Sequence, residues 1–162
     1  MKELIEYRTR MIERLVAAAH EFRAECLAVQ DVFTPLETGG WSVHQIAVHT
    51  RDVDALVYGL RARRTAIEDN PEFQNFDGEV YMAGHYSKSD PLDEILAGLV
   101  ENVESLAELL REMPSEVWAR VSTHVMLGGG LTMQGWVEKD LAHIEEHLKA
   151  IREAEINRFS SP

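Results

Sequence analysis

The sequence predicts an all-α fold built on four long amphipathic helices. Apolar residues recur at spacings of three and four, the repeat of one helical face, in residues 2–29, 42–64, 90–113 and 132–155. Between these segments, proline, glycine and capping residues end one helix and begin the next. The 162 residues, 45% of them hydrophobic, are enough to bury a core, so we expect residues 1–162 to form one domain.

The first helix is expected over residues 2–29, where the apolar residues form one continuous stripe. This stripe consists of Leu4, Tyr7, Met11, Leu15, Ala18, Phe22 and Cys26. Cys26 is the single cysteine of the chain, which excludes an internal disulfide framework and a cysteine-rich zinc site. We interpret it as a small buried residue, because free cysteine is usually buried.

The second helix begins with a capping box, in which Ser42 is the cap and Gln45 follows three residues later. Its expected buried face consists of Val43, Ile46, Ala47, Val53, Leu56, Val57 and Leu60. His49 lies on this face, whereas His44 is turned well away from it. The basic run 61–64 near the helix end is favoured by the helix dipole, and a second interpretation, that it grips an anion or a substrate, stays open.

The connection over residues 66–89 is long for a compact domain, and long loops often carry function. His85 within it is a weak candidate for a pocket residue, and a surface position is favoured. Asp90 and Pro91 then open the third helix as its cap and first helical residue. The third helix carries no inward-facing polar group suited to catalysis, so we expect a structural role for it.

The glycine run 128–130 could suggest a phosphate-binding loop, but it lacks the Lys-Ser/Thr pair that such loops require. We therefore interpret it as a flexible turn, preceded by an irregular stretch that contains His124. Thr132 can cap the fourth helix, which should continue to about residue 155.

The fourth helix carries the clearest chemical signal, because His143 and His147 are four residues apart and share one helical face. Together with the inward-facing His49, they could hold one metal ion. Asp140 is three residues before His143 and could accept the second N–H of that imidazole, as partners of metal-bound histidines usually do. Neutral imidazoles suit zinc, nickel or iron, and three ligands leave a coordination position open for water or substrate.

Composition excludes several classes of partner. The net charge of −12 argues against a general affinity for nucleic acid phosphates. No apolar run approaches the ~20 residues of a transmembrane helix, and the first residues lack a signal-peptide core. We therefore expect a cytoplasmic protein that binds neither nucleic acid nor membrane and acts on a small molecule.

A set of residues spread along the chain gives the sequence a resemblance to the DinB/YfiT-like family. They are Trp41, Ser42 and Val43, then His49 and Asp52, then Phe76 and Asp77, and finally the run 140–147 with its two histidines. The resemblance covers nearly the whole chain. It implies a four-helix bundle with a long connection between its second and third helices, a divalent metal held by His49, His143 and His147, and a homodimer. It also implies that a low-molecular-weight thiol is a possible cofactor, since some members are thiol S-transferases.

Two functions of different classes follow. In the first, the protein is a metal-dependent transferase that delivers a thiol to a small electrophile. Hydrolysis is less favoured, because no inward-facing general base stands out. In the second, it is a non-catalytic metal- or ligand-binding stress or interaction protein. The transferase prediction requires a cavity that opens at the metal and is lined by residues 66–89 and 120–131, whereas the second function does not.

Overall fold

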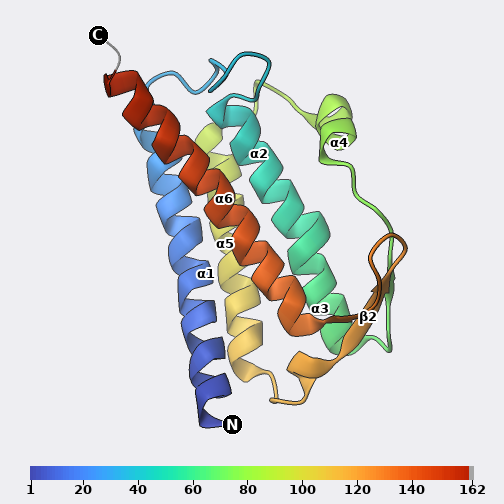
Figure 1. Cartoon of the computed structure of the whole chain (residues 1–162). Helices are drawn as coiled ribbons and strands as arrows, with labels where there is room; N and C mark the ends of the chain where they lie inside the picture. The colour runs from blue at the N-terminus through green and yellow to red at the C-terminus, as the bar shows by residue number, and fades with distance from the viewer. Residues whose placement is uncertain (161–162) are drawn as a thin grey trace.

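Four long helical segments lie side by side in the computed structural model, which describes residues 1–160 (Figure 1). They are α1 (Lys2–Ala28), the continuous run of α2 (Val43–Val53), η1 (Asp54–Tyr58) and α3 (Gly59–Ile67), then α5 (Leu92–Glu112) and α6 (Met133–Ser160). The predicted four-helix bundle is therefore confirmed. Within residues 1–160, no helix has both the length and the hydrophobicity to cross a membrane.

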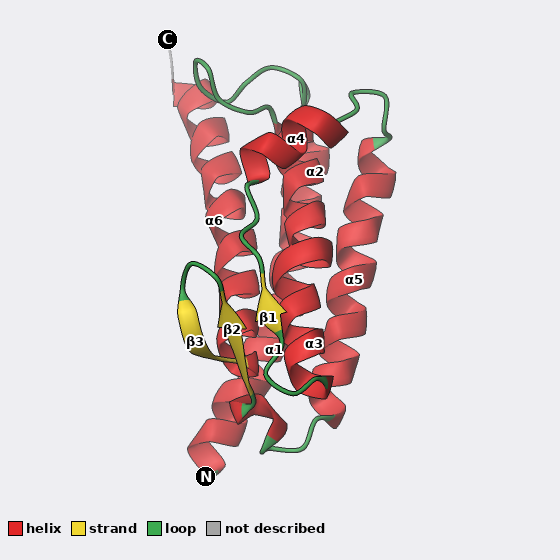
Figure 2. Ribbon diagram, turned by 90° about the vertical axis from the view of Figure 1, so that its right-hand side faces the viewer, coloured by secondary structure: helices red, strands yellow, loops and turns green. Residues whose placement is uncertain are grey.

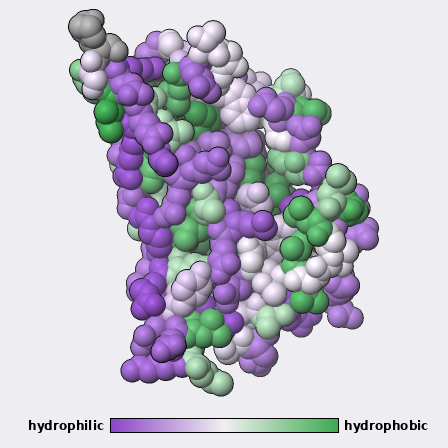
Figure 3. Space-filling view, in the orientation of Figure 1, coloured by the Kyte–Doolittle hydropathy of each residue, from purple (hydrophilic) through white to green (hydrophobic). Residues whose placement is uncertain are grey.

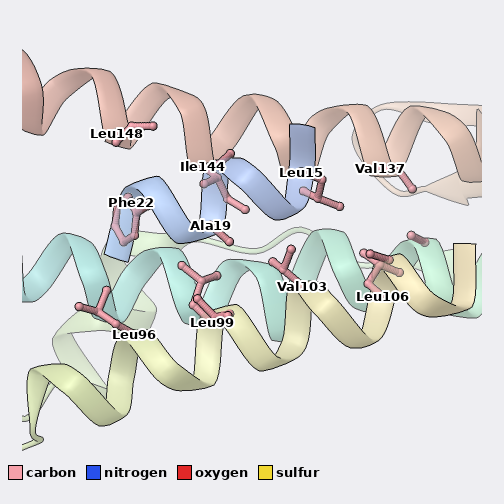
Figure 4. Close-up of a cluster of buried hydrophobic side chains, with 14 of the residues drawn as sticks. Leu15, Ala19, Phe22, Leu96, Leu99, Val103, Leu106, Val137, Ile144 and Leu148 are labelled. Atoms are coloured by element: carbon pink, nitrogen blue, oxygen red, sulfur yellow. The ribbon is translucent and has the colours of Figure 1, made fainter. Parts of the chain in front are cut away.

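The four segments form a ring around one core. Helix α1 packs against α5 and α6, and the α2–α3 run packs against the same two helices from the other side. Figure 4 shows side chains from α1, α5 and α6 that meet in this core, among them Leu15, Phe22, Leu99, Val103 and Ile144. Cys26 is fully buried, as predicted, and burial raises the pKa of its thiol to about 12. Cys26 is therefore a packing residue.

The directions of the helices explain the long connection. The chain ascends through α1, descends through α2–α3, descends again through α5 and ascends through α6 (Figure 1). Two consecutive helices that run the same way cannot be joined by a short turn, because the chain must first return along the bundle. The segment Val43–Ile67 is about 37 Å long at ~1.5 Å per residue, and the connection travels back over this length.

This connection and the segment before α6 contain structure that the sequence did not predict. The connection holds strand β1 (Glu72–Phe73) and the short helix α4 (Gly78–His85). Strand β1 pairs in parallel with β2 (Val121–His124), which pairs antiparallel with β3 (Gly128–Thr132) (Figure 2). The prediction of a flexible turn over residues 128–130 was wrong, because glycines have no side chains whose alternation could reveal a strand. Between α5 and β2 the chain forms the 3-10 helix η2 (Val117–Ala119).

The π-helical turn η1 changes which face of the second helix is buried. A π turn inserts an extra residue and rotates the following side chains relative to an α-helix. Leu56 and Leu60, predicted to be buried, are 45% and 39% exposed, while Val57 is buried. Arg61, in the α3 segment that follows the π turn, is buried as well.

The placement of His44 also differs from the prediction. Its side chain is 1% exposed, and both ring nitrogens are hydrogen-bonded. Nε2 donates to the backbone oxygen of Asp90 at 2.8 Å, which leaves Nδ1 to accept from the Tyr86 hydroxyl at 2.9 Å. His44 therefore ties the end of the connection to α2. Helix α5 begins at Leu92, with Pro91 in the cap position that had been expected for Asp90.

Candidate metal centre

Three histidine side chains converge between α2 and α6. His143 Nε2 lies 3.1 Å from His49 Nε2 and 3.1 Å from His147 Nε2. The three candidate ligand atoms all lie within 4.8 Å of one another. The structure therefore brings together the three residues that were predicted as ligands, one from a helix in the first half of the chain and two from the last helix.

The surroundings keep these imidazoles neutral, which is the form that binds metals. Burial, with a smaller contribution from His147, lowers the pKa of His49 to about 4. Burial and then the two neighbouring histidines lower the pKa of His143 to about 3. Burial also lowers the pKa of His147. At neutral pH the site therefore presents uncharged nitrogen donors.

The spacing of these nitrogens fits a small divalent ion. Each Zn–N bond is about 2.0–2.1 Å, so two ligand nitrogens of a tetrahedral site lie about 3.3 Å apart. The two 3.1 Å contacts are close to this value. His143 Nδ1 is buried and has no hydrogen-bond partner among residues 1–160, so the structure shows no acceptor that would orient this imidazole through its second nitrogen. The donor set suits zinc, nickel or iron.

Trp41 and Gly78 both pack against the imidazole of His49. The indole ring of Trp41 packs against its imidazole, with ring centroids 4.7 Å apart. Gly78, at the start of α4, lies on the ring as well, because a Cβ at that position would come within 2.8 Å of His49 Cε1. Asp77 fixes this end of α4 by accepting a hydrogen bond from the Val80 amide at 3.1 Å.

Asp140 does not make the predicted hydrogen bond to His143. Both of its carboxyl oxygens are buried and lack a hydrogen-bond donor among residues 1–160. Its carboxyl group faces Asp54 of the π turn instead, and burial and then the Asp54 carboxyl raise its pKa well above the ordinary value. Burial likewise raises the pKa of Asp54 to about 6. Two such carboxyls can hydrogen-bond to each other when one of them holds a proton, which accounts for their close approach.

A cavity of about 330 Å³ opens beside His49 and His143. Its walls include Phe76 from the long connection and Met126 and Leu127 from the β2–β3 hairpin. No aspartate or glutamate lines it. The cavity therefore joins the histidines to the two segments that the transferase prediction required.

His124 was expected in an irregular stretch. It lies at the end of β2 and lines this cavity. Its Nδ1 accepts hydrogen bonds from the amides of Met126 and Leu127, at 3.1 and 3.2 Å, so its ring holds the tip of the hairpin in place. Burial, and then the charge of Arg61, lower its pKa. His85 lies elsewhere, on the exposed face of α4, where its Nδ1 donates to the backbone oxygen of Tyr81.

A second cavity of about 520 Å³ reaches the third histidine. His147 and Trp41 line it, together with Glu37, Glu79 and Glu153. This cavity is acidic, in contrast to the first. The candidate metal centre therefore lies between two cavities. His49 and His143 line the first cavity, and His147 lines the second.

Sequence reasoning missed Tyr58 and left Arg61 undecided. The Tyr58 ring lies against His143 with centroids 5.7 Å apart, and both Tyr58 and Arg61 line the first cavity. Tyr58 ends the π turn and Arg61 follows it in α3, a region where the sequence shows no pattern for the turn. The basic run 61–64 was the available signal, and it divides in the structure, because Arg64 pairs with Glu68 while Arg61 enters the cavity.

Comparisons with known proteins agree with this architecture. The family described as "Mycothiol maleylpyruvate isomerase N-terminal domain" matches residues 9–149. Among solved structures, the chain is similar to YfiT from Bacillus subtilis, described as a probable metal-dependent hydrolase with an unusual four-helix bundle topology. The two share 22% sequence identity and a TM-score of 0.87 over 96% of this chain and 90% of that one. No curated protein matches the chain.

Proposed function

Since the chain belongs to the family of mycothiol maleylpyruvate isomerase N-terminal domains, we propose that it is a metal-dependent transferase that uses a small thiol. His49, His143 and His147 hold a divalent ion, zinc, nickel or iron, in this proposal. The substrate is a small electrophilic molecule. The proposed transferase is a homodimer, as the family resemblance implies, and acts in the cytoplasm.

One observation carries this proposal, namely the cavity that opens at His49 and His143. A site that only stores an ion or stabilises the bundle needs no space beside it. Here both the long connection and the β2–β3 hairpin contribute walls to such a space. The cavity therefore supports a reactive centre over a non-catalytic binding protein.

The cavity walls favour a thiol over water as the nucleophile. A divalent ion at this centre supplies Lewis acidity, which lowers the pKa of a coordinating thiol or water. No carboxylate of the described chain lines the cavity, and His124 uses its free Nδ1 lone pair on two backbone amides. Apart from the proposed ligands, the walls thus offer neither a carboxylate nor a free imidazole as a general base. A thiol, with an ordinary pKa of about 8.5, needs less help to ionise than water does.

The residues around the centre would then orient and shield the reactants. The thiol proton passes to solvent, the sulfur forms a bond to the electrophilic carbon, and the leaving group departs with the bonding electrons. Met126 and Leu127 on the hairpin exclude water from the reacting atoms, which strengthens electrostatic interactions there.

Hydrolysis is the second candidate. It is favoured by the acidic cavity, where Glu79 and His147 line the same space and a carboxylate could accept a proton from water. The solved structure of YfiT is described as a probable metal-dependent hydrolase, which is in line with this alternative.

The first experiment is the metal content of purified protein, measured by elemental mass spectrometry. The wild type, three single variants (His49→Ala, His143→Ala and His147→Ala) and the control His20→Ala are compared. His20 is exposed and bonded to Glu104, so its loss should leave the metal in place. Near-stoichiometric metal that each ligand variant loses supports the centre. A wild type that stays metal-free with zinc, nickel and iron salts contradicts it.

The second experiment separates the two reactions. Zinc-loaded protein is incubated with glutathione and 1-chloro-2,4-dinitrobenzene, and separately with 4-nitrophenyl acetate without thiol. The transferase proposal expects faster thiol consumption by zinc-loaded protein than by chelated protein. Ester cleavage without any thiol-dependent reaction would favour the hydrolase.

A further inference from the structure

Arg61 is a buried cation without an acidic partner. Its side chain is 8% exposed, and no carboxylate of residues 1–160 forms an ion pair with it. The guanidinium lies over the rings of Trp136 and Phe73, 4.9 and 5.6 Å from their centroids. Its Nη2 donates to the backbone oxygen of Gln74 at 2.8 Å. These contacts hold the side chain in place but leave its charge unbalanced.

An unbalanced buried charge is unusual in a folded protein. Arginine is rarely buried unless it is paired, because removing its charge from water is costly. Arg64, one turn further along the same helix, shows the common arrangement, since its Nε and Nη2 both bond to Glu68. Arg8 is equally buried and also lacks a carboxylate, but three hydrogen bonds to Gln134 and Ser115 hold it. Arg61 donates only to Gln74 among residues 1–160, which leaves guanidinium donors free for a ligand.

The first cavity also differs in charge from the rest of the molecule. The chain has 28 acidic and 16 basic residues, yet the cavity is lined by Arg61 and Lys139 and by no acidic side chain. Lys139 is exposed at the rim and forms no ion pair within residues 1–160. A protein with net charge −12 that gathers two cations around one cavity favours an anion there.

Part of the cavity lining is apolar. Met126 and Leu127, at the hairpin tip, are 74% and 59% exposed, and Phe76 lies beside them in the lining. Figure 3 shows hydrophobic surface on the side of the molecule where this hairpin lies. A ligand with an apolar body as well as a charged group would cover this surface.

We propose that this cavity binds a small organic carboxylate, with the carboxylate on Arg61 and Lys139 and the apolar body against Phe76, Met126 and Leu127. The far end of the ligand then faces His49 and His143. The planar guanidinium is suited to a carboxylate, because it offers two parallel N–H donors. The volume of about 330 Å³ lies at the lower end of ligand sites, which limits the ligand to a small molecule. The binding of the carboxylate does not depend on the proposed function. Only the reaction that the bound ligand would undergo rests on it.

The test compares phenylacetate with its neutral analogue phenylacetamide by isothermal titration calorimetry. Both are titrated into zinc-loaded and into chelated protein, for the wild type and for Arg61→Gln, Lys139→Gln and Arg64→Gln. We expect the wild type to bind phenylacetate about tenfold more tightly than phenylacetamide. Arg61→Gln should lose this preference, and Lys139→Gln should reduce it by about threefold. Arg64→Gln removes the same charge outside the cavity lining and should bind like the wild type.

Several results would overturn the inference. One is equal binding of the two compounds, and another is an equal effect of Arg61→Gln and Arg64→Gln. A carboxylate that binds zinc-loaded protein alone, with no loss in Arg61→Gln, would be a metal ligand. If Arg61→Gln fails to fold, Lys139→Gln decides, because Lys139 is exposed. Arg61-dependent binding to chelated protein would stand even if the protein bound no metal, so the two proposals fail separately.

Discussion

Gly78 lies so close to the His49 ring that any side chain at its position would force the ring or α4 to shift. A Cβ atom there would come within 2.8 Å of His49 Cε1 and 3.3 Å of Nδ1. Contacts under 3 Å are essentially never seen for real Cβ atoms. The first residue of α4 and the candidate ligand on α2 therefore set each other's position.

We predict that Gly78→Ala weakens metal binding by at least about tenfold, because the imidazole must rotate or α4 must move. The control is Gly84→Ala on the same short helix, where an added Cβ meets nothing within 4 Å. Zinc affinity is measured by competition with a chromophoric chelator. Equal zinc affinity in the two variants would show that α4 does not hold His49.

The Asp54–Asp140 pair should make stability depend on pH. Burial raises the pKa of Asp54 to about 6 and that of Asp140 well above its ordinary value. Between an ordinary carboxyl pKa of about 4 and these raised values, the folded protein holds more protons than the unfolded chain. The free energy of unfolding therefore falls as the pH rises through this window.

Asp54→Asn should remove part of this loss, because it eliminates one of the two titrating carboxyls while Asp140 stays buried. We expect the variant to be about 2 kcal/mol more stable than the wild type at pH 8 and similar to it at pH 4. Urea unfolding of chelated protein at several pH values measures the difference. Asp69→Asn, outside the pair, serves as the control. A stability gap that does not change with pH would contradict the pair.

His44→Ala should lower the stability of the fold and leave metal binding intact, whereas His49→Ala should lose the metal. His44→Ala leaves the Tyr86 hydroxyl and the Asp90 carbonyl without their buried partner, so we expect a loss of about 3 kcal/mol in unfolding free energy. The variant should still bind zinc. Chemical unfolding and metal content are measured on the same samples, with the exposed His20→Ala expected within about 0.5 kcal/mol of the wild type.

Zinc should stabilise the wild type and not the ligand variants. An ion that binds the folded state alone adds about 2.7 kcal/mol when its concentration is 100 times its Kd. We therefore expect the melting temperature of the wild type to rise by several degrees with zinc, and that of His147→Ala to stay constant. Differential scanning calorimetry measures both. An equal rise in the two proteins would indicate binding elsewhere.

The sequence predicted the helices well because each has a complete local signal. The capping box of Ser42 and Gln45 is formed as expected, and Thr132 caps the last helix by accepting a hydrogen bond from the Gly135 amide. The pairing of His143 and His147 also follows from local geometry, since a spacing of four residues defines one face. Their approach to His49 depends on how α2 and α6 pack, which only the wider pattern of apolar faces indicates.

The features that were missed depend on contacts between distant segments. Strand β1 is two residues long and exists through its pairing with β2, about fifty residues away in the sequence. His44 was placed outside because its helix alone does not reveal that the connection covers it. The π turn changes the buried face in mid-helix, and no residue pattern in the segment specifies it. Tertiary packing decided each of these positions.

The two separate cavities at the centre have a kinetic consequence. His49 and His143 face one cavity and His147 faces the other, so two reactants can reach the centre without sharing an entrance. Both could then be bound before any bond changes. Initial rates measured against both concentrations should give intersecting double-reciprocal lines, the pattern of a ternary complex. Parallel lines would mean that one product leaves before the second reactant arrives, which would contradict simultaneous binding through the two cavities.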